Sequence, residues 1–143
     1  MATTVEEKFT HAGLTCYTVV NPTLCTRCGY VSVPQEHPLF NVPLDKLEHI
    51  APEVCYKADG GVTFCGEHRT IPGWLIGWDG AHDWHKPDPE LVAKVPAELA
   101  SMMRMSGGND NAVVVTRELA RSNTEILAET IANFTEDGGN LPL

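Results

Sequence analysis

The sequence has no long apolar run, and its basic residues are scarce beside its acidic ones. No stretch approaches the roughly 20 apolar residues that span a bilayer, so we expect no membrane-embedded segment. Lys and Arg number 10 against 19 Asp and Glu, which gives a formal net charge of −9. Because a binder of the phosphate backbone needs a basic face, this balance argues against a nucleic-acid polymer as partner. A local basic pocket for a small anion remains open, with Arg27, Arg69 and Arg104 as contributors.

We expect no secretory signal in this sequence, and its number of cysteines is odd. Residues 1–10 carry acids where a signal peptide has a basic start followed by an apolar run. The cysteines number five, and an odd count in a reducing compartment does not favour a disulfide framework. We therefore expect a cytoplasmic protein whose thiols are free or bind metal.

The bulk composition suits one globular domain. The chain has 143 residues, of which 43% are hydrophobic and 20% are charged. We predict an α+β fold with a small antiparallel sheet, short helices and a C-terminal amphipathic helical segment. Residues 1–87 are predicted to form a mostly-β unit. Residues 88–143 are predicted to form a helical segment, which either packs on that unit or mediates self-association.

Local patterns place the expected elements along the chain. Runs rich in β-branched and aromatic residues predict strands at residues 14–20, 30–33 and 74–78. Residues 53–67 are predicted to form two strand segments around a Gly-Gly turn, and residues 44–50 a short helix. Asp88 and Pro89 have the N-cap and N1 preferences of a helix start, and Pro96 is expected to divide that region. An apolar stripe predicts a helix over residues 111–134.

Three short motifs follow one another in the first part of the chain. They are CGYVSVPQEHPLF at residues 28–40, DGGVTF at 59–64 and WLIGWDGAHD at 74–83. Together they resemble a family of small proteins encoded by bacteriophages and their hosts, which typically reads C-G-Y-V-G-V-P-x-x-H-P-L-Y, H-G-G-L-T and W-x-G-F-D-C-A-H. The likeness covers about residues 11–85. It implies a phage-type accessory protein in the host-cell cytoplasm, and no catalytic role is carried over with it.

Two positions depart from that family pattern. Asp59 stands where the family has the His of H-G-G-L-T, and Gly80 stands where it has Cys. If the family's chemistry needs that His and Cys, this chain either lacks the chemistry or replaces the His with Asp59.

Cysteine spacing raises a zinc hypothesis. Cys25 and Cys28 form a C-x-x-C-G pattern typical of a zinc knuckle, and Cys65 and His68 form C-x-x-H. The four side chains would make a closed tetrahedral site that stabilises two turns, as in a zinc-dependent interaction module. The alternative is two turns that carry thiols without a metal. A thiol nucleophile assembled from Cys28 or Cys65 with a His and an Asp has no local sequence signature.

Acidic and imidazole side chains crowd the end of the Trp-rich run. Asp79, His82, Asp83 and His85 lie within seven residues. Such groups act as ligands of a hydrolytic metal when His37 or His68 completes the set, although no H-E-x-x-H pattern is present. In the alternative, Asp79 caps a turn and His82 bonds to main chain.

A ligand pocket is the leading functional hypothesis. Aromatic residues concentrate in the motif-bearing half, and flat rings beside a few polar groups suit a planar, nucleotide-like ligand. The predicted ligand-binding residues are His37, Asp59, Trp78, Asp79, His82 and Trp84. Trp84, flanked by Asp83 and His85, is the aromatic expected to be exposed. We expect a binding protein for a small polar ligand, one that sequesters a host defence signal, with homo-oligomerisation through residues 111–135 as a further hypothesis.

Overall fold

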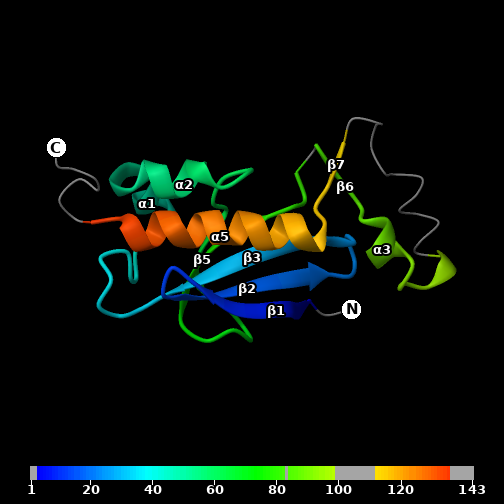
Figure 1. The fold of residues 1–143 in the computed structure, drawn as a ribbon, viewed down its shortest axis with the longest axis horizontal. Helices are drawn as coiled ribbons and strands as arrows, with labels where there is room; N and C mark the ends of the chain where they lie inside the picture. The colour runs from blue at the N-terminus through cyan, green and yellow to red at the C-terminus, as the bar shows by residue number, and fades with distance from the viewer. Residues whose placement is uncertain (1–2, 83, 99–111, 136–143) are drawn as a thin grey trace.

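A five-stranded antiparallel sheet forms the centre of the protein (Figure 1). The computed structural model describes residues 3–82, 84–98 and 112–135. Along the sheet the strands are β1 (Thr4–His11), β2 (Leu14–Asn21), β3 (Thr26–Val33), β5 (Trp74–Asp79) and β4 (Phe64–Glu67). The predicted α+β class with an antiparallel sheet is confirmed.

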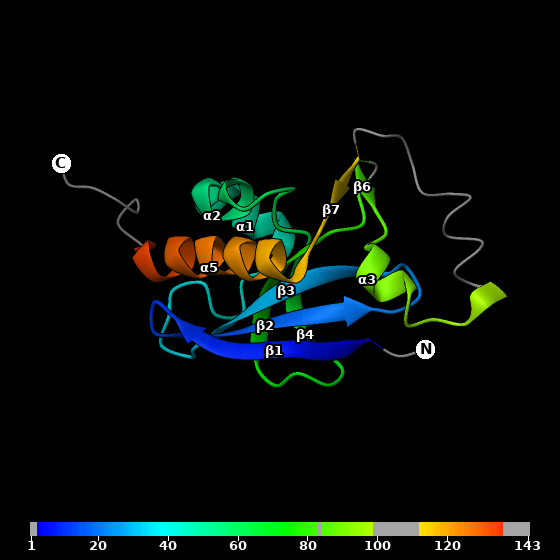
Figure 2. The same cartoon turned by 45° about the vertical axis from the view of Figure 1, so that its right-hand side comes forward.

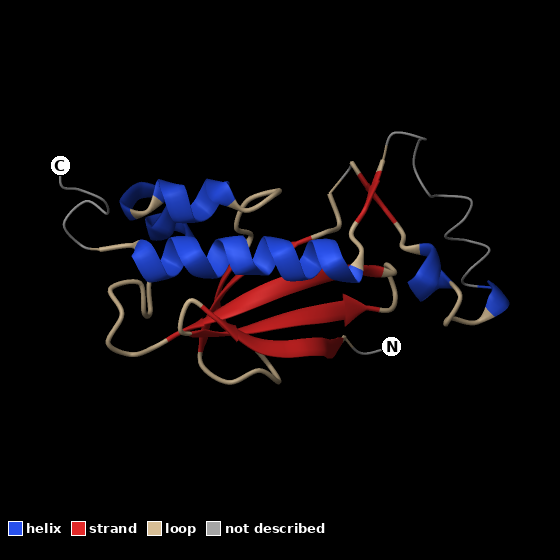
Figure 3. Cartoon of the chain, in the orientation of Figure 1, coloured by secondary structure: helices blue, strands red, loops and turns tan. Residues whose placement is uncertain are grey.

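Helices cover one face of this sheet. The long helix α5 (Arg117–Asn133) lies along β2 and β3, and α1 (Leu44–Ile50) and α2 (Pro52–Lys57) lie on the same side (Figure 2). Beyond the start of α5, a parallel pair of two-residue strands, β6 (His85–Lys86) and β7 (Val113–Val114), neighbours the short helix α3 (Pro89–Val92) (Figure 3). Among the described residues, no helix combines the length and apolarity needed to cross a bilayer.

The alternation of side chains along the strands decides which face meets α5. Cys16, Val31, Ile76 and other buried residues form the main core together with the helices. From α5 the core receives Leu127 and Ile131, both fully buried. Each such aliphatic side chain stabilises the fold by about 1.5–3 kcal/mol when it leaves water. The apolar stripe proposed for self-association is therefore buried against the chain's own sheet.

Gly29 sets how closely α5 approaches the sheet. A Cβ atom at this position would lie 2.1 Å from Thr124 Oγ1 and 2.4 Å from Trp78 Nε1. The indole N–H of Trp78 donates to Thr124 Oγ1 over 3.0 Å, and that hydroxyl donates to Ala120 O over 2.8 Å. The helix thus satisfies a buried indole that would otherwise lose its hydrogen bond to water.

The secondary structure differs from the sequence predictions in two elements, and one strand was not predicted. Residues 52–57 form helix α2 instead of a strand, because Pro52 occupies its first turn and Val54 and Cys55 face the core. The C-terminal helix begins at Arg117, since the β-branched residues before it extend into β7 and Thr116 caps the helix by accepting from Leu119 N. Strand β1 was not predicted, since its acids hide the alternation.

Other predictions hold. The strands expected at residues 14–20 and 74–78 correspond to β2 and β5, and the helix at 44–50 is α1. Asp88 caps α3 by accepting from Glu90 N, with Pro89 in the first turn. The helix predicted to open at Pro96 falls largely on residues that lie outside the described part of the chain.

Candidate functional site

Five of the polar and aromatic residues near the end of β5 form a compact group, here called the aromatic–acid cluster: Asp59, Asp79, His82, Trp84 and His85. Asp79 ends β5, and His85 begins β6. Asp59 lies in the segment after α2, and its backbone N–H donates to Asn123 Oδ1 over 2.7 Å. Three separate parts of the chain, including α5, therefore position the cluster.

Ring stacking organises its centre. The imidazole of His82 lies parallel to the indole of Trp84, with 4.4 Å between centroids and 14° between planes. The ring of His85 is tilted against both, at 5.3 Å from His82 and 5.2 Å from Trp84. Trp84 nevertheless keeps 46% of its surface exposed, as its charged neighbours in the sequence predict. One face of the indole is thus supported while the ring still meets solvent.

Local hydrogen bonds hold the turn that carries these rings. Asp79 Oδ1 accepts from Ala81 N over 2.9 Å, the turn-capping role expected of an Asp before glycine. The backbone N–H of His82 donates to His85 Nδ1 over 3.1 Å, and His85 N donates to His82 O over 2.9 Å. Trp84 O accepts from Val113 N over 2.7 Å, which ties the turn to β7.

Gly60 packs directly against the imidazole of His82. Its φ of +80° lies in the left-handed region that favours glycine. A Cβ atom at Gly60 would approach His82 Cε1 to 2.9 Å, so any other residue would displace the imidazole. Gly60 therefore permits the close approach of its segment to the cluster.

The imidazoles are incompletely paired. His82 Nδ1 is buried and forms no hydrogen bond within the described residues, with Asp79 Oδ1 at 3.8 Å. The pKa of His85 is lowered, first by burial and then by the neighbouring His82, while Asp59 and Asp79 act in the opposite direction. The lowered pKa favours the neutral imidazole, which suits the role of His85 Nδ1 as acceptor from the His82 amide.

Two of the six predicted ligand-binding residues lie elsewhere. His37 sits in the segment after β3, where its Nε2 is 2.8 Å from Ile131 O and its Nδ1 accepts from Leu39 N. Trp78 is buried under α5, with 3% of its surface exposed. Both residues form hydrogen bonds to α5. Of the six predicted residues, Asp59, Asp79, His82 and Trp84 therefore belong to the aromatic–acid cluster.

The four residues of the predicted zinc site do not come together. Cys28 lies within β3 instead of a knuckle turn, and its thiol is 3.8 Å from the hydroxyl of Tyr30. Cys25 is buried in the preceding turn beside Leu91, whereas Cys65 packs against the main core.

His68, the fourth of these residues, accepts from Thr70 N and Ile71 N through its Nδ1 and lies against the ring of Tyr30. In the described parts of the chain, no group of three or more His, Cys, Asp or Glu side chains is placed to hold a metal ion. His37 and His68, which the hydrolytic-metal hypothesis proposed as further ligands, instead form hydrogen bonds with main-chain atoms.

The thiols are poorly suited to nucleophilic attack. Burial raises the pKa of Cys28 to about 11, with Tyr30 acting against that change and Asp79 adding to it. Burial likewise raises the pKa of Cys65 to about 12. Because the thiolate is the reactive form, neither cysteine supplies a nucleophile at neutral pH.

A buried ion-pair network lies beyond the start of α5 and was not predicted. Arg27, expected from the sequence as a contributor to an anion pocket, is fully buried and already paired. Its guanidinium donates to Glu6 over 2.6 and 3.2 Å, to Asp88 over 2.5 Å and to Val115 O over 3.0 Å. These partners come from β1, the start of α3 and the chain before α5. Because they are far apart in the sequence, no local sequence pattern predicts the network.

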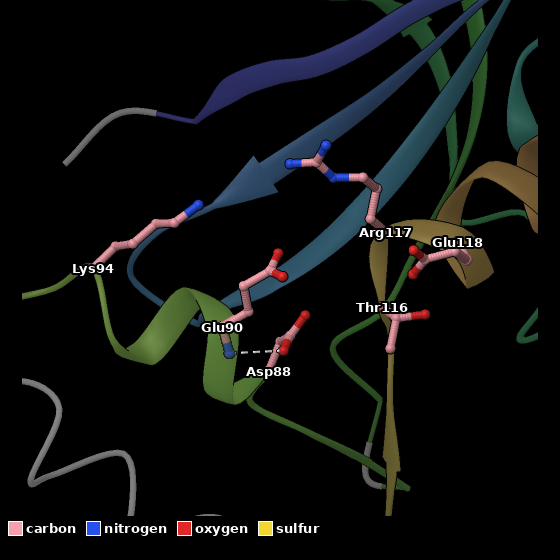
Figure 4. A pocket seen from close by; sticks show the side chains of 6 residues that line it. All are labelled: Asp88, Glu90, Lys94, Thr116, Arg117 and Glu118. Carbon is pink, nitrogen blue, oxygen red and sulfur yellow. Dashed lines mark hydrogen bonds between the residues drawn. The ribbon is translucent and has the colours of Figure 1, made fainter.

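An open pocket of about 480 Å³ adjoins this network. It is lined by Asp88, Glu90, Lys94, Thr116, Arg117 and Glu118 (Figure 4). Figure 4 shows Lys94 and Arg117 on opposite sides of Glu90. Asp88 and Thr116 cap α3 and α5, and Glu90 reaches Arg27 over 3.3 Å. The pocket lining combines three carboxylates with two cations, and its Asp88 and Thr116 fix the ends of two helices.

Comparison of the chain with protein-family models, with curated proteins and with solved structures finds no match. The likeness to the phage-encoded family therefore rests on the three motifs alone. At Gly80, where that family has Cys, a Cβ atom would lie 2.6 Å from Arg27 O and 2.7 Å from Val115 Cγ2. Asp59, which stands in place of the family's His, belongs to the aromatic–acid cluster.

Proposed function

We propose that this protein binds a small polar ligand, and that a planar ring of the ligand stacks on Trp84. The observation that carries the proposal is the parallel stack of the exposed Trp84 indole on the His82 imidazole, which itself packs against Gly60. An aromatic ring that one neighbour holds in place loses little freedom when a second ring stacks on it. Nucleotide-like compounds are one class with such a ring.

Polar groups around Trp84 supply orientation. Asp59 is exposed and the Asp79 side chain is 41% exposed, so both offer carboxylate acceptors for exocyclic amino or hydroxyl groups. A few directed polar atoms beside an apolar ring are typical of small-molecule sites. Sequestration of a host defence signal would need only this binding step, and the resemblance to phage-encoded proteins motivates that reading.

The test compares ligand binding by Trp84→Ala and Leu24→Ala. A panel of cyclic and ADP-ribose-type nucleotides is added to the wild-type protein, and the melting temperature is followed by circular dichroism. We expect at least one compound to raise the melting temperature, and we expect Trp84→Ala to abolish the rise. Leu24 is 49% exposed in the turn between β2 and β3, so Leu24→Ala removes an equally exposed apolar side chain and should leave the rise intact. No rise with any compound, or equal rises in both variants, would contradict the proposal.

A further inference from the structure

We infer that the group which the aromatic–acid cluster receives is a planar organic cation. This inference rests on the proposed function and specifies the charge of the ligand's ring. It combines two observations: an exposed indole face, and two flanking carboxylates that keep acceptor capacity for a ligand.

The carboxylate of Asp59 is exposed and receives no hydrogen bond or ion pair from residues 3–82, 84–98 or 112–135. Only the backbone N–H and carbonyl of Asp59 are engaged, both by the side-chain amide of Asn123. Its charge nevertheless reaches the cluster, since it acts on the imidazole of His85. Asn123 thus fixes the main chain and leaves the carboxylate available.

Asp79 retains one open oxygen. Its Oδ1 accepts from Ala81 N over 2.9 Å, and His82 Nδ1 lies 3.8 Å from the same oxygen. No hydrogen bond to Oδ2 forms within the described residues. Two negative charges therefore stand beside the rings, each with acceptor capacity left for a ligand.

Among the residues that the structure describes, no Lys or Arg forms an ion pair with either carboxylate. Lys57 and Lys86 are near the cluster in the sequence, yet within the described chain neither forms an ion pair with Asp59 or Asp79. The arginines that do form ion pairs, Arg27, Arg117 and Arg121, pair with carboxylates other than these two. Burial lowers the pKa of His85, which favours its uncharged form. Both carboxylates act on the imidazole of His85, and the imidazoles of His82 and His85 contact the indole of Trp84.

Cation binding uses both features at once. The face of an indole attracts a cation through its quadrupole, by about 0.5–1 kcal/mol at exposed sites and more on desolvation. Each nearby carboxylate adds a Coulomb attraction for a cation and an equal repulsion for an anion. We therefore expect a planar cation to bind at least about 10-fold more tightly than its anionic counterpart. In a nucleotide-like ligand, the phosphates would point away from Asp59 and Asp79.

The test uses three rings of nearly identical shape: N1-methylnicotinamide, nicotinamide and nicotinate, with charges of +1, 0 and −1. Each is titrated into ¹⁵N-labelled protein, and the indole N–H resonance of Trp84 is followed by NMR after assignment with Trp84→Phe. The expected order of affinity is cation, then neutral ring, then anion, and the preference for the cation should weaken as salt is added.

Matched variants separate local from overall charge. Asp59→Asn/Asp79→Asn should abolish the cation preference, while Glu48→Gln/Glu53→Gln makes the same change in net charge outside the cluster and should preserve it. The side-chain amide that Asp79→Asn introduces would retain an oxygen for Ala81 N, and Asp59→Asn alone serves if the double variant fails to fold.

The outcomes distinguish the inference from the proposed function. If nicotinamide or nicotinate binds as tightly as the cation, or if Asp59→Asn/Asp79→Asn keeps the preference, the inference is wrong and ring binding at Trp84 stands. If none of the three rings moves the Trp84 resonance, both the inference and the proposed function are overturned.

Discussion

Arg27 Nη1 and Asp88 Oδ2 lie 2.5 Å apart, and 61 residues of chain separate the two side chains. The guanidinium has no solvent exposure, and the Asp88 and Glu6 side chains that face it are each 9% exposed. This contact joins β3 to α3 at the end of the molecule where α5 begins.

Arg27→Met is expected to destabilise the protein strongly. Removing the guanidinium leaves the buried carboxylate of Asp88 without a counter-charge and leaves Glu6 with only the half-exposed Arg117. Breaking a buried ion pair in this way typically costs about 3–5 kcal/mol. Arg117→Met is the control, since Arg117 also contacts Glu6, over 3.2 Å, but its side chain is 50% exposed. Its loss should stay below about 1 kcal/mol. Urea unfolding gives both free energies, and similar values for the two variants would show that the network contributes little.

The same network predicts an acid-sensitive contribution to stability. Burial acts to raise the pKa of Glu6, but hydrogen bonding and charge from Arg27 and Arg117 outweigh it and lower the pKa below its ordinary value of 4.5. A carboxylate with a lowered folded-state pKa stabilises the fold above pH 4.5 and loses that contribution as the pH falls through the folded-state pKa. The difference in free energy of unfolding between wild type and Glu6→Gln should therefore be constant near neutral pH and shrink below pH 4.5. Urea titrations from about pH 7 to about pH 3 would measure it, and a constant difference throughout would refute the assignment.

Gly60→Ala tests the packing of Gly60 against the imidazole of His82. Alanine at a φ of +80° costs about 1–2 kcal/mol in backbone strain, and its Cβ would also collide with the imidazole. Gly13→Ala is closely matched, because Gly13 has a φ of +79° and no atom lies within 4 Å of its Cβ position. We expect Gly60→Ala to be the less stable variant, and to shift the indole N–H resonance of Trp84 while Gly13→Ala does not. Identical spectra and stabilities of the two variants would show that Gly60 does not position the rings of the cluster.

Cys28 should react slowly in the folded protein. With burial raising its pKa from 9.0 to about 11, the thiolate fraction at pH 8 falls about 100-fold. Alkylation by iodoacetamide, followed at the Cys28 peptide by mass spectrometry, is expected to be slower by about that factor in native protein than in urea. Equal rates in the two conditions would mean that the thiol is accessible and activated.

The parts of the fold that the sequence predicts are those set by neighbouring residues. The β-branched and aromatic runs of β2 and β5 and the Asp88-Pro89 start of α3 are local signals, and the structure has all three elements. Strand β1 escaped prediction because Glu6 reaches the buried Arg27, so a charged residue occupies an inward position. The Val113–Val114 run was absorbed into the helix prediction because an apolar stripe does not by itself reveal the helix start.

Prediction of the site follows the same rule. Asp79, His82 and Trp84 are close in the sequence and lie together, and Asp59 joins them through a turn that the Gly-Gly pair marks. His37 and Trp78 were assigned to the site by residue type, yet each is needed to bond α5. The zinc hypothesis failed because spacing alone does not show that Cys28 continues a strand.

The position of α5 in the chain has a consequence for biosynthesis. Every strand of the five-stranded sheet precedes this helix, and the helix covers the apolar face of β2 and β3. During translation that face would stay open to water, or to a chaperone, until residues 117–133 leave the ribosome. The nascent chain is thus most prone to aggregate just before its long helix emerges.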